Sequence, residues 1–486
     1  MIGSKFYYYF YYSLLQTVIL SASLLTYFCT LCCDALKYTV FAKRSSEIIV
    51  KFRSRYLFLS LILFAAPAFA GEAAIESFNL KNGMQVILLE NHSIPAVSHT
   101  VWYRVGGADD YQGRSGLAHY NEHMMFQGTD KVAAGEFSRT ITTLGGQFNA
   151  FTGRDYTAYY VTIAKENLAK VMELESDRMI NLAPTPENFA KERQVIIEER
   201  RMSIENRPEA LLAEEMQAAL FRNSPYHNPL IGWKHEMENL SRGDVLAFHK
   251  QFYNPANAVL VVGGDINRAE LSYLADKYFG EIPAGEKYVR NWNVEPPQSV
   301  ERHIKMSHPN VKQPQLVRYY TAPSVNLGDK DAVLPLSLLA QILGGGTTSK
   351  FYQDLVVKQK IATEISLGYD GISQGEGILQ ISATPAEGVE LSKLEIAIDK
   401  AIAGVKIGKE DLPHAKTLLK AETIYARDGI EGMARIIGFL NMANLPLDYF
   451  NKWAGLVDNV TLEQVQQASK NIFNSKNSVT GYLLPL

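Results

Sequence analysis

The stretch GLAHYNEHMMFQGT (Gly116–Thr129) contains the sequence His-x-x-Glu-His. On an α-helix, residues four apart lie one above the other, so His119 and His123 can hold the same metal ion. Glu122 points to the same side but is adjacent to His123, too close along the backbone to join it comfortably as a third ligand. The spacing therefore predicts a metal site that has its own general base.

The order of the motif is the reverse of the His-Glu-x-x-His signature of zinc peptidases. Catalytic zinc sites use three protein ligands and keep a fourth position open, so one more ligand is needed. The segment KERQVIIEERRM (Lys191–Met202) is typical of a helix and places Glu192 and Glu199 two turns apart on one face. One of the two can bind the metal while the other orients a histidine. Ligation by two histidines and a carboxylate favours zinc.

Five further stretches of the sequence, all after the first histidine motif, carry recognisable motifs. They are LGGQFNAFTGRDYTAYY (Leu144–Tyr160), ERQVIIEERRM (Glu192–Met202), SPYHNPLIG (Ser224–Gly232), FYNPANAVLVVGGD (Phe252–Asp265) and LGGGTTSKFYQDLV (Leu343–Val356). Together with the His-x-x-Glu-His stretch, they resemble the insulinase/pitrilysin family of zinc peptidases, and among its members the bacterial proteins that are similar to processing peptidases. The resemblance covers residues 75–486, and it implies one Zn²⁺ per chain.

The resemblance also implies roles for single residues. It implies His119, His123 and Glu199 as the zinc ligands and Glu122 as the base that takes a proton from the attacking water. It implies that Glu192 supports the site from behind. Three further residues match the strand on which family members bind an extended peptide by strand addition. These are Asn149, Ala150 and Thr152.

One departure from the family pattern affects the expected partners. Active single-chain relatives carry an Arg and, seven residues later, a Tyr in the second domain, and both reach the substrate. The aligned positions here are Val356 and Thr363, which cannot replace them. Either Tyr369 substitutes after a local shift or a second subunit supplies the pair, as in the two-chain enzymes of the family. The sequence favours the second interpretation, in which the partner is a paralogous chain or a second copy of this one.

The N-terminal region has the pattern of an export signal. Lys51, Arg53 and Arg55 precede an apolar segment that ends in Ala-Phe-Ala at Ala70, which predicts a secretory signal peptide cleaved after this residue. A signal peptide does not normally begin fifty residues into a chain, so we interpret residues 1–50 as an extension from a wrongly assigned start codon. The alternative is a genuine membrane anchor over Tyr7–Cys33, which is long enough to span a bilayer. Membrane contact is expected only if this segment is retained.

Composition excludes several other classes of protein. The chain has 486 residues with 47% apolar and 20% charged residues, which is ordinary for a globular protein of two or more domains. All three cysteines lie before residue 34, so neither disulfides nor cysteine zinc sites are expected in the mature part. The formal net charge of −3 gives no indication of nucleic-acid binding.

The order of predicted elements indicates an α+β fold that is repeated. We expect a first domain over residues 71–285, a Pro-rich linker over residues 286–314 and a second domain over residues 315–486. Each half is predicted to be an α/β roll, with a mixed sheet and helices packed on one face. The second half lacks metal ligands, because the segment AVLPLSLLAQIL (Ala332–Leu343), which corresponds to the metal helix, has no histidine. The two halves would face each other as a clamshell around a peptide chamber.

The sequence thus predicts a secreted zinc endopeptidase that acts on peptides or unfolded segments, located in the periplasm of a Gram-negative bacterium or outside the cell. The missing Arg/Tyr pair predicts that this chain is the metal-bearing subunit of a two-chain enzyme. An alternative of another class is a non-catalytic, chamber-shaped scaffold subunit. The intact set His119, Glu122, His123 and Glu199 argues against it, since a scaffold does not need these residues.

Overall fold

The computed structural model describes residues 75–425 and 429–486. The predicted signal peptide and its cleavage after Ala70 lie outside these residues, as does the alternative membrane anchor. Within the described part of the chain, no helix combines the length and the apolar character needed to cross a membrane.

The first half of the described chain contains a mixed sheet of six strands in the order β1-β2-β6-β3-β5-β4. All neighbours in this sheet are antiparallel except β2 and β6, which are parallel. The strands are β1 (Ile75–Asn79), β2 (Gln85–Glu90), β3 (Ala96–Tyr103), β4 (Gln147–Thr152), β5 (Thr157–Ala164) and β6 (Ala258–Gly264).

Helices of the first half follow and separate these strands. They are α2 (Leu117–Met124), α3 (Glu136–Thr143), α4 (Leu168–Ile180), α5 (Pro186–Arg200), α6 (Pro208–Leu220), α7 (Lys234–Met237), α8 (Arg242–Phe252) and α9 (Arg268–Phe279). A short π-helical segment, η3 (Arg201–Glu205), joins α5 to α6. Helix α5 begins at Pro186, because Thr185 caps it by accepting a hydrogen bond from the backbone N of Asn188 and proline suits the first helical position.

The second half repeats the same sheet topology. Its five strands have the order β7-β11-β8-β10-β9, with β7 and β11 parallel and the other neighbours antiparallel. Without β1, the first sheet has the same order and the same directions, so β4 and β9 are equivalent edge strands. The strands are β7 (Arg302–His308), β8 (Gln315–Ala322), β9 (Ala362–Asp370), β10 (Gly377–Pro385) and β11 (Ser478–Pro485).

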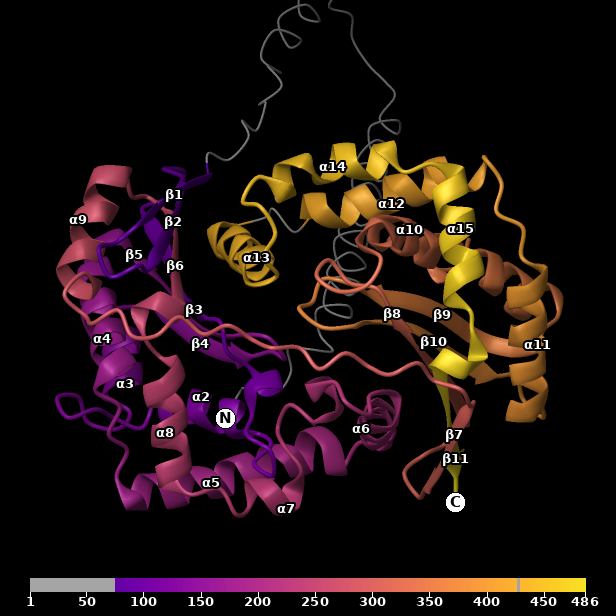
Figure 1. The fold of residues 1–486 in the computed structure, drawn as a ribbon, viewed down its shortest axis with the longest axis horizontal. Helices are drawn as coiled ribbons and strands as arrows, with labels where there is room; N and C mark the ends of the chain where they lie inside the picture. The colour runs from indigo at the N-terminus through magenta and orange to yellow at the C-terminus, as the bar shows by residue number, and fades with distance from the viewer. Residues whose placement is uncertain (1–74, 426–428) are drawn as a thin grey trace, which may run out of the picture. The chain divides into compact units, whose positions relative to one another are not determined.

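The helices of the second half include α10, which is the counterpart of α2. They are α10 (Val333–Gly344), α11 (Leu391–Gly404), α12 (Asp411–Tyr425), α13 (Ile430–Met442), α14 (Tyr449–Asn459) and α15 (Leu462–Ile472), with a π-helical segment η7 (Tyr352–Lys358) before β9. The predicted α+β fold with two similar halves is confirmed (Figure 1).

One detail of the expected organisation is wrong. The sequence predicts an irregular linker over residues 286–314, but this segment contains β7, which pairs with β11 in the second sheet. The sequence of β7, RHIKMSH, alternates between exposed and partly buried positions and has few apolar residues, so it gives a weak strand signal. The repeated topology shows that the second sheet begins with this strand.

Within each half the helices of that half cover one face of the sheet, as expected, and a helix of the other half covers the opposite face. The main core of the first half lies between the sheet and α2, α4, α8 and α9. On the opposite face, Ile87, Trp102 and Val261 pack against Ala434 and Ile437 of α13, a helix of the second half. Because both faces are buried, β2 and β6 are almost continuously apolar.

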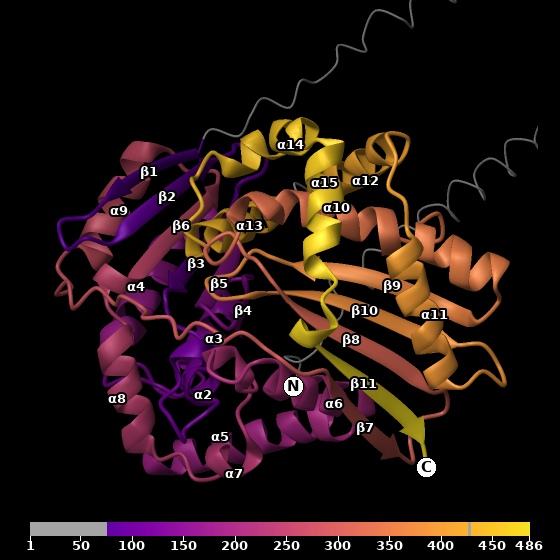
Figure 2. The same ribbon diagram turned by 45° about the vertical axis from the view of Figure 1, so that its right-hand side comes forward.

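The second sheet is likewise covered on one face by a helix of the first half. Its main core lies against α10, α11, α12, α14 and α15. On the other face, Leu212, Met216 and Leu220 of α6 pack against Tyr319 and Leu483. Figures 1 and 2 show α13 lying over the first sheet and α6 lying against the second sheet. The two halves therefore exchange one helix each.

Candidate metal centre

Two helices of the first half carry the predicted metal site. Helix α2 carries His119, Glu122 and His123, and α5 carries Glu192 and Glu199. Helix α2 packs its apolar residues into the main core, so its polar side faces α5 and β4. The sequence pattern therefore produces the local arrangement that it predicts.

The three predicted ligands lie together. The Nε2 atom of His123 is 3.2 Å from Oε2 of Glu199, and Nε2 of His119 is 3.8 Å from the same oxygen. All three ligand atoms lie within 4.8 Å of one another, and they form the only such group of His, Cys, Asp or Glu residues in ranges 75–425 and 429–486. Ligand atoms at about 2.0 to 2.2 Å from a tetrahedral zinc ion are about 3.3 to 3.6 Å apart. The two separations to Glu199 lie close to this range, so the three side chains can hold one such ion.

Glu192 lies behind the ligands. Its Oε1 atom is 2.8 Å from Nδ1 of His123, and its Oε2 accepts a hydrogen bond of 2.7 Å from Gln127. A proton on Nδ1 of His123 leaves the lone pair of Nε2 directed toward Glu199 and the ligand position. Residue reasoning left open which of the two glutamates of α5 binds the metal. The structure places Glu199 beside Nε2 of both histidines and Glu192 beside Nδ1 of His123.

The buried charges of the site favour a cation. Burial raises the pKa of Glu199, but its hydrogen bond with His123 and the nearby His119 outweigh this effect and bring the pKa down to about 2. Burial lowers the pKa of His123, yet Glu192 and Glu199 raise it to about 10. Burial lowers the pKa of His119 to about 4. The carboxylates thus stabilise positive charge between them.

Glu122 is held separately from the ligands. Its Oε2 atom accepts a hydrogen bond of 2.5 Å from Oγ1 of Thr152, at the end of β4. Burial raises the pKa of Glu122 to about 7, against the opposing effects of His123 and the Thr152 hydrogen bond. A carboxylate with a pKa near neutrality is suited to exchange a proton in both directions.

The predicted peptide-binding strand β4 is an edge strand next to α2. It pairs with β5 on one side and has no neighbouring strand on the other within the described sheet. Ala150 packs toward the main core, on the same side as Thr152, whereas Phe151 packs against Trp102 on the opposite face. The backbone N of Ala150 donates to the side-chain Oδ1 of Asn149 at 2.9 Å. The free edge of β4 therefore runs past the candidate base.

The positions aligned with the absent Arg/Tyr pair lie in the second half. Val356 belongs to η7 and packs against the core of the second sheet. Thr363 is exposed on β9 and donates to the carbonyl of Thr384. Tyr369 donates its hydroxyl proton to the carbonyl of Pro323 at 2.6 Å, so this hydroxyl is already engaged within the second half.

The sequence reasoning missed three residues that hold the site. Asp110 accepts hydrogen bonds from the backbone N atoms of Gly116 and Ala118, which fixes the start of α2. Gln127 lies just beyond the end of α2 and donates to Glu192, a contact that no spacing in the sequence indicates. Arg200 directly follows Glu199, but no sequence pattern indicates its partners.

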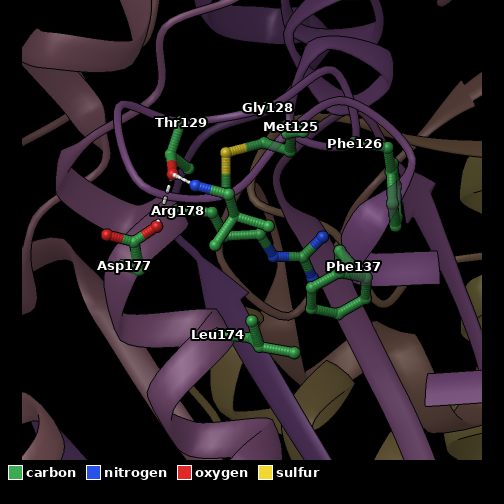
Figure 3. A pocket seen from close by; sticks show the side chains of 10 residues that line it. Met125, Phe126, Gly128, Thr129, Phe137, Leu174, Asp177 and Arg178 are labelled. Carbon is green, nitrogen blue, oxygen red and sulfur yellow. Dashed lines mark hydrogen bonds between the residues drawn. The ribbon is translucent and has the colours of Figure 1, made fainter. Parts of the chain in front are cut away.

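A small cavity near the end of α2 is not a second functional site (Figure 3). It has a volume of about 10 Å³, which is room for one water molecule. The hydroxyl of Thr129 donates to Asp177 at 2.5 Å beside it, and the guanidinium of Arg178 lies 4.0 Å from the ring centre of Phe137. A peptide cannot enter this space.

Comparison with known proteins identifies the family. The family model described as insulinase (peptidase family M16) matches residues 85–234, and the model described as peptidase M16 inactive domain matches residues 239–419. The chain belongs to the insulinase family of zinc peptidases, as its motifs predict. The second match covers much of the half that carries none of the candidate ligands His119, His123 and Glu199.

Individual relatives agree with this assignment. The zinc protease PqqE of Helicobacter pylori is 28% identical over 425 residues, which cover 84% of this chain and 93% of that protein. An uncharacterized zinc protease of Rickettsia bellii is 27% identical and covers 82% of this chain and 96% of its own length. The crystal structure of a protease from Helicobacter pylori superimposes with a TM-score of 0.78 at 26% identity, covering 85% of this chain and all of that chain.

A more distant solved structure shows the same fold. The first half of the periplasmic protease PqqL from Escherichia coli gives a TM-score of 0.72 at 18% identity, covering 84% of this chain and 92% of that chain. The predicted clamshell class of fold, built from two similar halves, is confirmed by these neighbours.

Proposed function

We propose that this protein is a zinc endopeptidase that hydrolyses peptides or unfolded polypeptide segments. The observation that carries the proposal is the convergence of His119, His123 and Glu199 on one position, with the carboxylate of Glu122 beside it. The names of the relatives as zinc proteases support it.

The residues of the site have distinct tasks. A zinc ion held by His119, His123 and Glu199 would act as a Lewis acid that polarises the peptide carbonyl and makes water more acidic. Glu122 accepts the proton of the attacking water at its Oε1 atom, because Oε2 is occupied by Thr152. Glu122 then passes this proton to the leaving amine.

The edge of β4 is the proposed binding place for the substrate. An extended peptide that pairs with β4 would form main-chain hydrogen bonds and pass close to Glu122. Such binding depends little on side chains, which agrees with a substrate that is unfolded. Enclosure between the two halves would exclude folded proteins.

We further propose that this chain is the metal-bearing subunit of a two-chain enzyme. Val356 and Thr363 cannot supply an Arg/Tyr pair, and the hydroxyl of Tyr369 is engaged with Pro323. A paralogous chain that carries Arg and Tyr seven residues apart would complete the site, and a second copy of this chain is the other option. The periplasm or the exterior is the proposed location, supported by the signal pattern that ends at Ala70 and by a periplasmic structural neighbour.

A scaffold role is the second candidate function. It is favoured by the match of residues 239–419 to an inactive peptidase domain. The complete set of ligands and base in the first half favours the enzyme instead.

Replacement of Glu122 by Gln tests the peptidase function. The variant keeps the shape of the side chain but cannot accept the proton, so hydrolysis of a quenched fluorescent peptide library should fall by about 10² to 10⁴-fold. Zinc content should stay at the wild-type level, because Glu122 is not a ligand. Hydrolysis that survives at the wild-type rate would contradict the mechanism.

Purification from the native source tests the two-chain proposal. We expect a second chain to co-purify and the peptidase activity to require both chains. Full activity of the isolated mature chain at its monomer mass would contradict this proposal without affecting the metal site.

A further inference from the structure

The ligand Glu199 lies near the C-terminal end of its helix. It is the last residue but one of α5, and the chain then continues into the π-helical segment η3. Other contacts between the two metal helices lie earlier on α5. Tyr120 stacks on Phe189 with ring centres 4.9 Å apart, and His123 pairs with Glu192. These contacts do not hold the end of α5 that carries the ligand.

Arg200 connects this end of α5 to two other segments. Its Nη1 and Nη2 atoms donate to the two carboxylate oxygens of Glu214 on α6, at 2.9 and 2.7 Å. Nη1 also donates to the backbone carbonyl of Gly232 at 2.8 Å. The side chains of Arg200 and Glu214 are only 6% and 8% exposed. A planar guanidinium can make all three bonds at once, whereas a lysine ammonium has no such fork.

Gly232 in turn contacts the start of the metal helix α2. A Cβ atom on Gly232 would lie 2.3 Å from the carbonyl O of Ser115, and one on Gly116 would lie 2.2 Å from the carbonyl O of Ile231. The two backbone segments therefore touch directly. Glu236 strengthens this contact by accepting hydrogen bonds from the backbone N and the hydroxyl of Ser115, at 2.8 and 2.6 Å.

The contacts form one continuous path from one ligand to another. The path runs from Glu199 to its neighbour Arg200, across to Gly232 and from there to Gly116, which precedes the first residue of α2. His119 lies in the first turn of that helix. We propose that Arg200 is a positioning residue, which fixes the separation between Glu199 and His119 through its bond to Gly232.

This inference rests on the proposed function, because it concerns the affinity of the site for zinc. Residues that orient metal ligands typically change metal affinity by about 10- to 100-fold when they are replaced. Loss of Arg200 alone would also leave the buried carboxylate of Glu214 unpaired, which destabilises the fold for a separate reason. The test must therefore remove both members of the pair.

The decisive variant is Arg200→Met combined with Glu214→Met, made in the full chain. A matched control is Arg318→Met combined with Glu395→Met in the second half, because the Arg318 side chain is also 6% exposed and pairs with Glu395. Zinc affinity is measured by competition between Zn²⁺ and a chromophoric chelator, and the melting temperature of each protein is measured in the presence of EDTA. The visible spectrum of the Co²⁺-loaded protein reports the ligand geometry.

We expect the Arg200/Glu214 variant to bind zinc about 10- to 100-fold more weakly than the wild type and to have an altered cobalt spectrum. The Arg318/Glu395 variant should keep wild-type affinity and spectrum. A smaller loss of zinc affinity is expected for Arg200→Lys, because this variant retains the positive charge. If the double variant does not fold, Arg200→Lys serves as the test.

Wild-type zinc affinity in the folded Arg200/Glu214 or Arg200→Lys variant would overturn the positioning role while leaving the proposed function intact. An equal loss in the Arg318/Glu395 variant would also overturn it, because the effect would then be general destabilisation. A wild-type protein that binds no zinc would contradict both the proposed function and this inference.

Discussion

Glu198 and Glu199 are neighbours on α5, yet they have different surroundings. The side chain of Glu199 is 18% exposed and lies near both histidines, whereas that of Glu198 is 47% exposed and pairs with Arg201 on the outside of the helix. A helix turns by about 100° per residue, so adjacent side chains face different directions. One helical step therefore separates a candidate metal ligand from a surface residue.

Replacement of each glutamate by Gln tests this distinction. Glu199→Gln removes a charged ligand, so zinc affinity should fall by more than the roughly 100-fold upper range for supporting residues. Glu198→Gln should leave zinc affinity unchanged and serves as the matched control. Both are measured by chelator competition, and equal losses in the two variants would contradict the assignment of the ligand.

At the residue scale, much of the site could be predicted from spacing. The His-x-x-Glu-His motif places His119 and His123 on one helix face, with Glu122 at the side of it, whatever the rest of the fold does, and Glu199 lies near the two histidines in the structure. Helical geometry could not separate the roles of Glu192 and Glu199, since both lie on one face. Arg200 and Asp110 could not be predicted, because their partners come together only through the tertiary fold.

At the scale of elements, the start of α2 is a point of close packing. Gly116 has a positive φ of 83°, and backbone atoms of the segment that includes Ile231 occupy the space where a side chain would begin. Both features require glycine. The position of the metal helix therefore depends on a backbone contact as well as on its apolar face.

Two alanine substitutions separate these features. Gly113 also has a positive φ, of 74°, but no atom lies within 4 Å of the place that a Cβ atom would occupy, so Gly113→Ala should cost only about 1 to 2 kcal/mol for the left-handed conformation. Gly116→Ala also brings the new methyl group into a clash with the backbone. Overpacking of this kind costs about 1 to 3 kcal/mol, in addition to the cost of the left-handed conformation. Thermal unfolding measures both, and equal losses of stability would argue against the close contact.

Strand β7 shows where element prediction from sequence has a limit. Its alternating partly buried and exposed residues are the pattern of an edge strand, but charged and histidine residues on the exposed side hide it within a Pro-rich region. Buried strands such as β6 are easily predicted because they are continuously apolar. The weak signal comes from the position of β7 at the edge of the sheet.

At the scale of the whole molecule, the exchange of α6 and α13 ties the two halves together. The two come close at Gly438 of α13, where a Cβ atom would lie 2.1 Å from the indole of Trp102 in β3. Arg104 also donates to the backbone O of Asn441, at 3.1 Å, and to the side chain of the same residue. An amphipathic sequence reveals which face of a helix is apolar but not which sheet will cover it, so this exchange could not be predicted.

A pair of glycine variants in two helices of the second half tests the exchange. Gly455 is exposed on α14 with nothing within 4 Å, so Gly455→Ala should stabilise the protein by up to about 1 kcal/mol through helix propensity. Gly438→Ala should instead destabilise it by about 1 to 3 kcal/mol, because the methyl group clashes with the buried Trp102. Stabilisation by both substitutions in thermal unfolding would show that α13 does not pack on the first sheet as described.

The metal content of the purified mature protein tests the central claim most directly. Elemental analysis after dialysis against metal-free buffer should find one zinc ion per chain, and the same analysis of a His119→Ala/His123→Ala variant should find none. Wild-type protein without stoichiometric zinc, or a variant that retains it, would contradict the account.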